Sequence, residues 1–294
     1  MKPHDLWRSI LVNGGHACPT DEVLSELHRY CGMPINEIKE LAEQSPSMTG
    51  DVWNRKDRST SVGLQHFYDN VSHWVFGTLA YHARQAEGEI YPLPVLVADY
   101  LEDFAPGTFL DFGCGVATAS LLFDKLGWEV TAADISGPLL DFARWRMNDR
   151  GANIKICDLR RARLPDDEYD VICAFNTIGH VPNALDTISD LRRALRSNGF
   201  LFFDIDTRTK EENIPWHLYQ QDGEIVRSVR KLGFHKATML GPMHVFRKTE
   251  MAPLQRSFVG AYDMLRYNQT ALQLEKLATR AKRRLARVSS PREL

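Results

Sequence analysis

Short apolar runs alternate with segments of helical spacing along the chain between Thr108 and Phe234. The apolar runs have the length and composition of buried strands, and turn residues separate them from the helical segments. This alternation is typical of a parallel sheet with helices on both faces. We therefore predict an α/β fold whose core occupies residues 105–251.

The preceding region, residues 1–104, has helical spacing and no alternating strand pattern. We predict one amphipathic helix that begins at Thr20 and ends at Gly32, and a second that begins at Pro34. Residues 46–60 are polar and contain proline and glycine, so they predict a loop. The whole region is expected to be helical apart from such connections.

Aromatic residues are dense from Ser61 to Gln85, with helical spacing throughout, and predict one helix there. A short helix over 95–101 is expected to lead into the first strand. At the other end of the core, residues 222–233 predict a helix closed by glycine, and residues 235–251 predict two short strands around a Gly-Pro turn. Residues 252–294 form a basic tail with helical spacing.

The most informative stretch is an apolar strand, residues 108–112, that runs into a glycine loop. Gly113 and Gly115 have no Cβ, so a ligand can approach their backbone closely. A dinucleotide fingerprint would need a third glycine at position 118, where this chain has Thr118. Asp111 at the strand's end would repel a pyrophosphate but could hold an ammonium group. S-adenosylmethionine carries an ammonium, a sulfonium and no phosphate, and is favoured over NAD or ATP.

This loop resembles the first motif of the class I S-adenosylmethionine-dependent methyltransferases. The match is Leu110, Asp111, Gly113 and Gly115, and Ala117 stands where the family has a third glycine. Segments similar to the later motifs of that family follow in order at residues 130–136, 154–159, 169–176, 178–181 and 191–206. The resemblance covers about residues 105–250 and implies a Rossmann-like, seven-stranded core. We expect the α-helical N-terminal region, residues 1–104, to lie over this core as a lid region.

The resemblance also implies a set of cofactor-binding residues. Asp134 would accept hydrogen bonds from both ribose hydroxyls, and Asp158 would bind the adenine amino group, although a helix N-cap would also suit an aspartate at position 158. Asn176 would face the crevice at the end of the fourth strand, with loop capping as its alternative role. The complete predicted set is Asp111, Gly113, Cys114, Gly115, Asp134, Ile135, Asp158, Leu159 and Asn176.

Two residues are predicted to act near the reacting atoms. His180 follows the fourth strand and has an ordinary pKa that suits a general base, although a histidine there could instead fix its loop. Tyr68 lies on the aromatic helix, which we interpret as a lid because aromatic faces stabilise a sulfonium. Trp74, Trp216 and His217 are substrate-binding candidates, and Tyr68 and Trp74 are both also suited to the core.

Composition and charge restrict the classes of partner. The net charge of −2 argues against a nucleic-acid-binding surface, and no apolar run reaches the roughly twenty residues that span a bilayer. The five cysteines show no metal-type pairing, so we expect no metal site and a reduced, cytoplasmic protein. A homodimer is left open.

We therefore predict transfer of a methyl group from S-adenosylmethionine to a small molecule, a natural-product or amino-acid-like metabolite. Transfer would proceed by in-line displacement, and the helical region would shape the acceptor pocket. Two alternatives stay open: an enzyme that cyclises or cleaves S-adenosylmethionine without donating its methyl group, and a non-catalytic partner of methyltransferase-like fold.

Overall fold

The computed structural model describes residues 2–12, 18–55, 61–206, 217–219 and 222–249. Its described strands form a seven-stranded sheet in the order β3-β2-β1-β4-β5-β7-β6. The strands are β1 (Thr108–Phe112), β2 (Glu129–Asp134), β3 (Lys155–Asp158), β4 (Tyr169–Ala174), β5 (Leu195–Phe203), β6 (Phe234–Leu240) and β7 (Met243–Lys248). The first five are parallel, and β7 runs antiparallel to both of its neighbours. The predicted Rossmann-like α/β core is confirmed.

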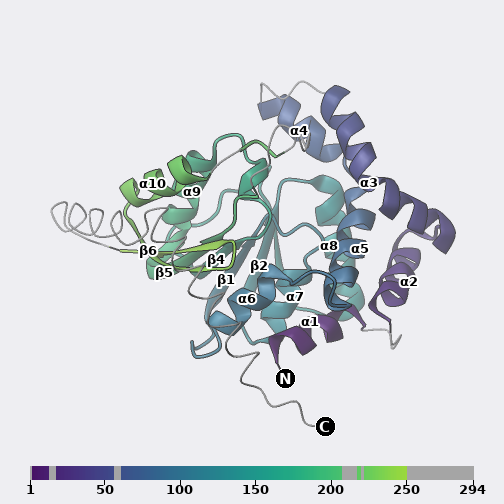
Figure 1. The fold of residues 1–294 in the computed structure, drawn as a ribbon, viewed down its shortest axis with the longest axis horizontal. Helices are drawn as coiled ribbons and strands as arrows, with labels where there is room; N and C mark the ends of the chain where they lie inside the picture. The colour runs from purple at the N-terminus through teal and green to yellow at the C-terminus, as the bar shows by residue number, and fades with distance from the viewer. Residues whose placement is uncertain (1, 13–17, 56–60, 207–216, 220–221, 250–294) are drawn as a thin grey trace, which may run out of the picture.

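Helices cover both faces of this sheet (Figure 1). On one face lie α6 (Leu93–Tyr100), α7 (Thr118–Lys125) and α8 (Gly137–Arg150), and on the other lie α9 (Ala184–Ala194) and α10 (Gly223–Lys231). Because side chains alternate along a strand, Phe109 enters the core under α7 while its neighbour Leu110 enters the core under α9. The Phe109 ring stacks on Phe123 at 3.9 Å between centroids.

The N-terminal helices pack on the face that α7 and α8 cover. They are α1 (Pro3–Leu11), α2 (Pro19–Cys31), α3 (Ile35–Arg55), α4 (Ser61–Asp69) and α5 (Trp74–Ala86). Apolar side chains of α1, α2 and α5 belong to the same buried cluster as those of β1 and β2. None of the helices in the described ranges is both long and apolar enough to cross a membrane.

The predicted loop over 46–60 is wrong for its first half, because α3 continues through Pro46 to Arg55. Ser45, Thr49 and Trp53 follow one another at intervals of four and form a buried stripe. The Thr49 hydroxyl donates to the Ser45 carbonyl at 2.8 Å and lies 2.9 Å from Nε2 of His73. Packing of this stripe outweighs the hydrogen bond that proline removes. Residues 56–60 lie outside the described residues.

The single aromatic helix predicted from Ser61 to Gln85 is two helices, α4 and α5. The break follows Asp69, where the side-chain amide of Asn70 donates to the His66 carbonyl at 2.7 Å. A side chain that satisfies the backbone locally competes with continuation of the helix. The turn allows α4 to pack over the carboxyl end of β2 while α5 packs against α3.

The helix and two strands predicted at the end of the core are present as α10, β6 and β7. The position of Gly199 differs from the prediction. The motif at residues 191–206 resembles a helix, a glycine turn at Gly199 and the fifth strand, but β5 already begins at Leu195. The pairing with β4 jumps there, from Tyr169 beside Leu195 to Val171 beside Phe200, so Gly199 lies in an irregular part of the strand. The predicted tail, 252–294, lies outside the described residues.

Candidate cofactor and acceptor site

The candidate site lies at the carboxyl ends of β1 and β4, which are neighbours in the sheet. The chain leaves β1 for α7 on one face and leaves β4 for α9 on the other. This point is the topological switch point of the sheet, the place at which open α/β sheets bind ligands. The predicted residues at the ends of β1, β2 and β4 meet at this edge.

The glycine loop after β1 needs its glycines for two different reasons. Gly113 has φ +73°, and a Cβ there would lie 2.3 Å from the Thr177 hydroxyl, so the loop packs directly against the loop after β4. Gly115 has φ +53°, and nothing lies within 4 Å of the position of its missing Cβ. The first glycine thus closes the turn, and the second leaves backbone open to a ligand.

Asp134 ends β2 and organises the loop from the other side. Its Oδ2 accepts the Gly115 backbone N–H at 2.9 Å, and its Oδ1 accepts the Ser136 N–H at 2.8 Å. Burial raises the pKa of Asp134, while these backbone donors oppose the rise. The Ile135 backbone N–H also bonds to this carboxylate, so about one of its roughly four acceptor positions remains for a ribose hydroxyl.

Asp111 is the penultimate residue of β1 and is 2% exposed. The Ser120 hydroxyl donates to its Oδ2 at 2.6 Å. Burial raises the pKa of Asp111 to about 7; Ser120 opposes this shift and the charge of Asp134 adds to it. A cationic ligand beside Asp111 would relieve the cost of its buried charge, so the carboxylate pair fits the charge of S-adenosylmethionine.

The other residues predicted around the cofactor have backbone roles in this structure. The Cys114 N–H donates to the Ala133 carbonyl at 3.1 Å, and its buried thiol has a raised pKa because of burial. The Leu159 N–H donates to the Asp134 carbonyl at 3.0 Å, which joins the ends of β2 and β3. The Ile135 carbonyl accepts from Gln65 on α4 at 3.1 Å.

Asp158 is engaged in an ion pair inside the protein. Arg160 donates to Oδ1 from Nε at 2.7 Å and to Oδ2 from Nη2 at 2.6 Å, and its backbone N–H adds a third bond to Oδ1 at 3.1 Å. This pairing with Arg160 lowers the pKa of Asp158. By lone-pair count, Oδ2 keeps one acceptor position. Adenine binding by Asp158 stays a prediction.

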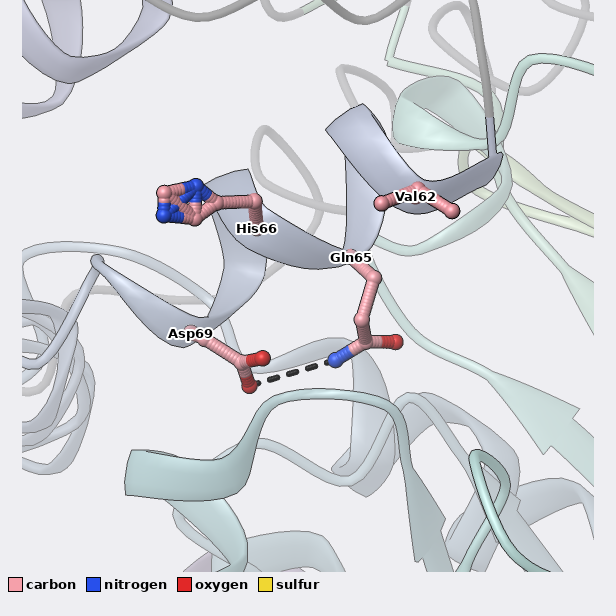
Figure 2. Close-up of a pocket in the computed structure, with 4 residues that line it drawn as sticks. All are labelled: Val62, Gln65, His66 and Asp69. Carbon is pink, nitrogen blue, oxygen red and sulfur yellow. Dashed lines mark hydrogen bonds between the residues drawn. The ribbon is translucent and has the colours of Figure 1, made fainter.

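Helix α4 covers the end of β2 through polar side chains that are partly exposed to solvent. Figure 2 shows Gln65 and Asp69 side by side on α4, joined by a hydrogen bond of 3.1 Å, around a hollow of about 380 Å³ that Val62 and His66 also line. Asp69 accepts from Arg160 at 3.1 Å, the same arginine that pairs with Asp158. Helix α4 therefore contacts the residues that follow β2 and β3, the two strands that end in the predicted ribose-binding and adenine-binding aspartates.

The aromatic side chains predicted as a lid form a small cluster beside Asp134. Tyr68 packs edge-on against Phe67 at 5.2 Å and against Trp74 at 5.9 Å, and the Ser136 hydroxyl donates to the Tyr68 carbonyl. Burial raises the pKa of the Tyr68 phenol, and the charge of Asp134 raises it further. Tyr68 therefore stays protonated near neutral pH, where it can donate a hydrogen bond but cannot serve as a base. The Trp74 indole donates to Thr49 at 2.7 Å.

The structure brings His180 and His217 together beyond the end of β4. Their rings meet edge-on at 4.5 Å, and Nδ1 of His217 lies 3.0 Å from the Asp206 carbonyl. His180 ends a short 3-10 turn, η1 (Ile178–His180). Asn176 precedes this turn with φ +49°, a conformation that asparagine tolerates, and its backbone N–H donates to Asp204 at 2.8 Å. Trp216 lies outside the described residues.

Two parts of this site were not predicted from the sequence. Asp204 is buried at the carboxyl end of β5, and burial raises its pKa to about 6. The sequence could have identified Asp204 as a site residue, because it directly follows a predicted strand of the core. The Asp69–Arg160 contact had no such signal, because 91 residues separate its partners.

The strand order, the glycine loop and the acidic residue that ends β2 define a class I S-adenosylmethionine-dependent methyltransferase domain, preceded here by helices α1 to α6. Residues 110–203 match a protein family described as "Methyltransferase domain". The family resemblance inferred from the sequence is confirmed.

Known proteins of similar sequence include ubiquinone biosynthesis O-methyltransferases. That of Actinobacillus pleuropneumoniae (serotype 7) is 32% identical over 134 residues, which cover 41% of this chain and 56% of that protein. The chain thus spans little more than half the length of that relative. The enzyme of Photobacterium profundum is 28% identical over 205 residues, 65% of this chain and 81% of that protein. Among solved structures, the PH0226 protein of Pyrococcus horikoshii OT3 has a TM-score of 0.45 at 22% identity, covering 58% of this chain and 92% of that chain.

Proposed function

We propose that this protein transfers the methyl group of S-adenosylmethionine to a small-molecule acceptor by in-line displacement. The observation that carries the proposal is the pair of buried carboxylates, Asp111 and Asp134, beside a glycine loop whose Gly115 faces open space. Two negative charges and an accessible backbone suit a cationic adenosyl compound and oppose a pyrophosphate. The match of residues 110–203 to a methyltransferase domain supports the same ligand.

When bound, S-adenosylmethionine supplies an electrophilic methyl group on a sulfonium. The chain's own residues would bind and orient it. Asp134 would accept from a ribose hydroxyl, and Asp111 would offer its charge to an ammonium, directly or through water. Tyr68 and Trp74 would shield the crevice from water on the α4 side. Orientation of bound reactants can contribute about 7–11 kcal/mol to such a transfer.

The acceptor would enter on the side of β4 and β5, near His180, His217 and Asp204. We propose a small metabolite, of natural-product or amino-acid-like type, as the acceptor. The ubiquinone biosynthesis O-methyltransferases among the relatives favour an oxygen nucleophile. A protonated hydroxyl would need a base, for which His180 is the proposed residue.

The experiment has two parts, binding and product analysis. Calorimetry should show binding of S-adenosylmethionine and S-adenosylhomocysteine, with NAD as the pyrophosphate control. The protein is then incubated with methyl-labelled S-adenosylmethionine and a panel of phenolic and amino-acid-like acceptors. We expect S-adenosylhomocysteine and a labelled acceptor in equal amounts. Methylthioadenosine as the product would contradict methyl donation, and absence of cofactor binding would contradict the whole proposal.

A further inference from the structure

A buried arginine holds the end of the glycine loop. Arg146 lies on α8 and is 0% exposed. Its Nη1 donates to the Val116 carbonyl at 2.9 Å and to the Thr118 hydroxyl at 2.7 Å. Its Nε and Nη2 donate to the two carboxylate oxygens of Glu26, on α2, at 2.9 and 3.1 Å. A rigid guanidinium thus joins the cofactor loop to the N-terminal region.

The residue between the two contacts on the loop is strained. Ala117 has φ +56° and precedes the first residue of α7, in the left-handed region that favours glycine. The related family has glycine at this position, as the loop motif indicated. Strained residues persist where their surroundings fix them, and here Arg146 grips the residue on each side, Val116 and Thr118.

His82 of α5 completes the arrangement around Thr118. Its Nδ1 lies 2.9 Å from the Thr118 hydroxyl. Because the arginine can only donate, the Thr118 oxygen accepts from Arg146 and its hydroxyl hydrogen is left for the ring nitrogen. Burial, together with the charge of Arg146, lowers the pKa of His82 to about 3, so the ring is neutral. In the tautomer with the proton on Nε2, the Thr118 hydroxyl accepts from Arg146 and donates to Nδ1 of His82.

Glu26 sets the orientation of the arginine. Burial raises the pKa of this carboxyl, but Arg146 and Arg150 outweigh burial and the net shift is downward, so Glu26 is charged. Arg150 donates to Glu26 from Nε at 2.9 Å and from Nη2 at 2.7 Å, and to the Ile10 carbonyl. Arg150 thus shares the carboxylate with Arg146, but its hydrogen bonds go to α1 and α2 and not to the glycine loop.

We infer that Glu26, Arg146 and Thr118 are positioning residues for the cofactor: they hold Ala117 in its strained conformation and so fix the glycine loop for binding. The inference rests on the proposed function only for the identity of the ligand. Arg146 and Thr118 are both 0% exposed, so they would act through the loop and not by touching the ligand. In this arrangement the N-terminal helices form part of the cofactor site.

The test compares Thr118→Val, which removes the hydroxyl, with Thr118→Ser, which keeps it. Loss of these hydrogen bonds should weaken binding of S-adenosylmethionine about five-fold by calorimetry, and serine should restore it. Arg150→Met is the matched control, since it breaks contacts with Glu26 and Ile10 but none with the loop. We expect Arg150→Met to lower the unfolding temperature and to leave the dissociation constant unchanged. Equal affinity of the valine variant and the wild type would overturn the inference, as would equal weakening by Arg150→Met.

The strain at Ala117 is tested by making the Thr118→Val change in a protein that already carries Ala117→Gly. Glycine accepts a left-handed conformation at little cost, so Thr118→Val should weaken binding less in an Ala117→Gly protein. Amide hydrogen exchange of residues 113–118 in the ligand-free protein gives a readout without any cofactor. Exchange should be faster in Thr118→Val than in Thr118→Ser or Arg150→Met. If the wild type fails to bind S-adenosylmethionine, the proposed function fails, whereas unchanged exchange in Thr118→Val would refute the positioning role alone.

Discussion

Asp111 and Asp134 are buried carboxylates at the ends of neighbouring strands, and burial raises the pKa of each. The electrostatic cost of these buried charges would favour a cationic ligand in the proposed site, because a cation would relieve it. Asp158 is the opposite case, since Arg160 already neutralises it and lowers its pKa. Three aspartates at adjacent strand ends therefore offer a ligand different amounts of uncompensated charge.

The affinity for S-adenosylmethionine should depend on pH through Asp111. Its pKa is raised to about 7, and the cationic ligand favours the ionised form. Affinity should therefore be constant above about pH 8 and fall as pH drops below about 7, by at most about ten-fold per pH unit. For the folding stability of the ligand-free protein we expect the opposite dependence on pH. Because folding raises the pKa of Asp111 from 3.8 to about 7, this group's contribution to stability is fully present below pH 3.8 and is lost as the pH rises to about 7. Calorimetry from about pH 5.5 to 8.5 measures the first effect, and Asp111→Asn should flatten it.

His180→Ala should lower turnover while leaving the affinity for S-adenosylmethionine unchanged. The reason is its place beyond the end of β4, against His217 at 4.5 Å, on the proposed acceptor side. Steady-state kinetics and calorimetry on the same preparation separate the two quantities. An equal loss of turnover in His217→Ala would show that the two histidines act as a pair. Unchanged turnover in both variants would make His180 a residue that fixes its loop.

The sequence predicted the positions of Asp111 and Asp134 at the carboxyl ends of strands, and their role in binding stays a prediction. Asp111 and Asp134 could be placed because a strand and a glycine turn fix their positions locally. The ion pair of Asp158 could not, because its geometry depends on where Arg160 turns after β3. The strain at Ala117 had no local signal either: alanine is a small change from glycine in size, whereas its φ of +56° requires outside support.

At the scale of elements, packing decided the boundaries that local signals misplaced. Pro46 predicted a loop, but the buried stripe of Ser45, Thr49 and Trp53 keeps α3 helical across it. Asn70 carries no strong break signal, yet it separates α4 from α5 by bonding to His66. The sheet was predictable because strand and helix periods differ over the whole core, whereas a helix end depends on one or two contacts.

The contacts of α4 should affect cofactor binding more than stability. Asp69 pairs with Arg160 at 3.1 Å and is 41% exposed, so solvent screens the pair and its contribution is about 0–1 kcal/mol. Asp69→Ala should therefore weaken S-adenosylmethionine binding by no more than about five-fold, with a smaller difference at high salt. Glu89→Ala, which removes the exposed partner of Arg84, is the matched control. Equal effects of the two variants on calorimetric affinity would argue against a covering role for α4.

At the scale of the whole molecule, the N-terminal helices and the core share one apolar cluster and one buried carboxylate, Glu26, which pairs with Arg146 and Arg150 of α8. The fold class followed from the sequence, but this docking did not, because Glu26 and Arg146 are 120 residues apart and each lies in a segment of ordinary helical pattern. The family resemblance also stops near residue 105, so it gave no information about how α1 to α5 sit on the core.

Breaking the buried pair should destabilise both regions together. Glu26→Ala leaves Arg146 and Arg150 without their shared carboxylate, and removal of one partner of a buried ion pair costs about 3–5 kcal/mol. Asp141→Ala, which removes the exposed partner of Arg144, should change the unfolding temperature little. Thermal unfolding followed by tryptophan fluorescence tests this, because Trp7 lies in α1 and Trp128 lies beside β2. We expect one transition, shifted down in Glu26→Ala. Two separate transitions in the wild type would show that the N-terminal helices and the sheet do not unfold as one unit.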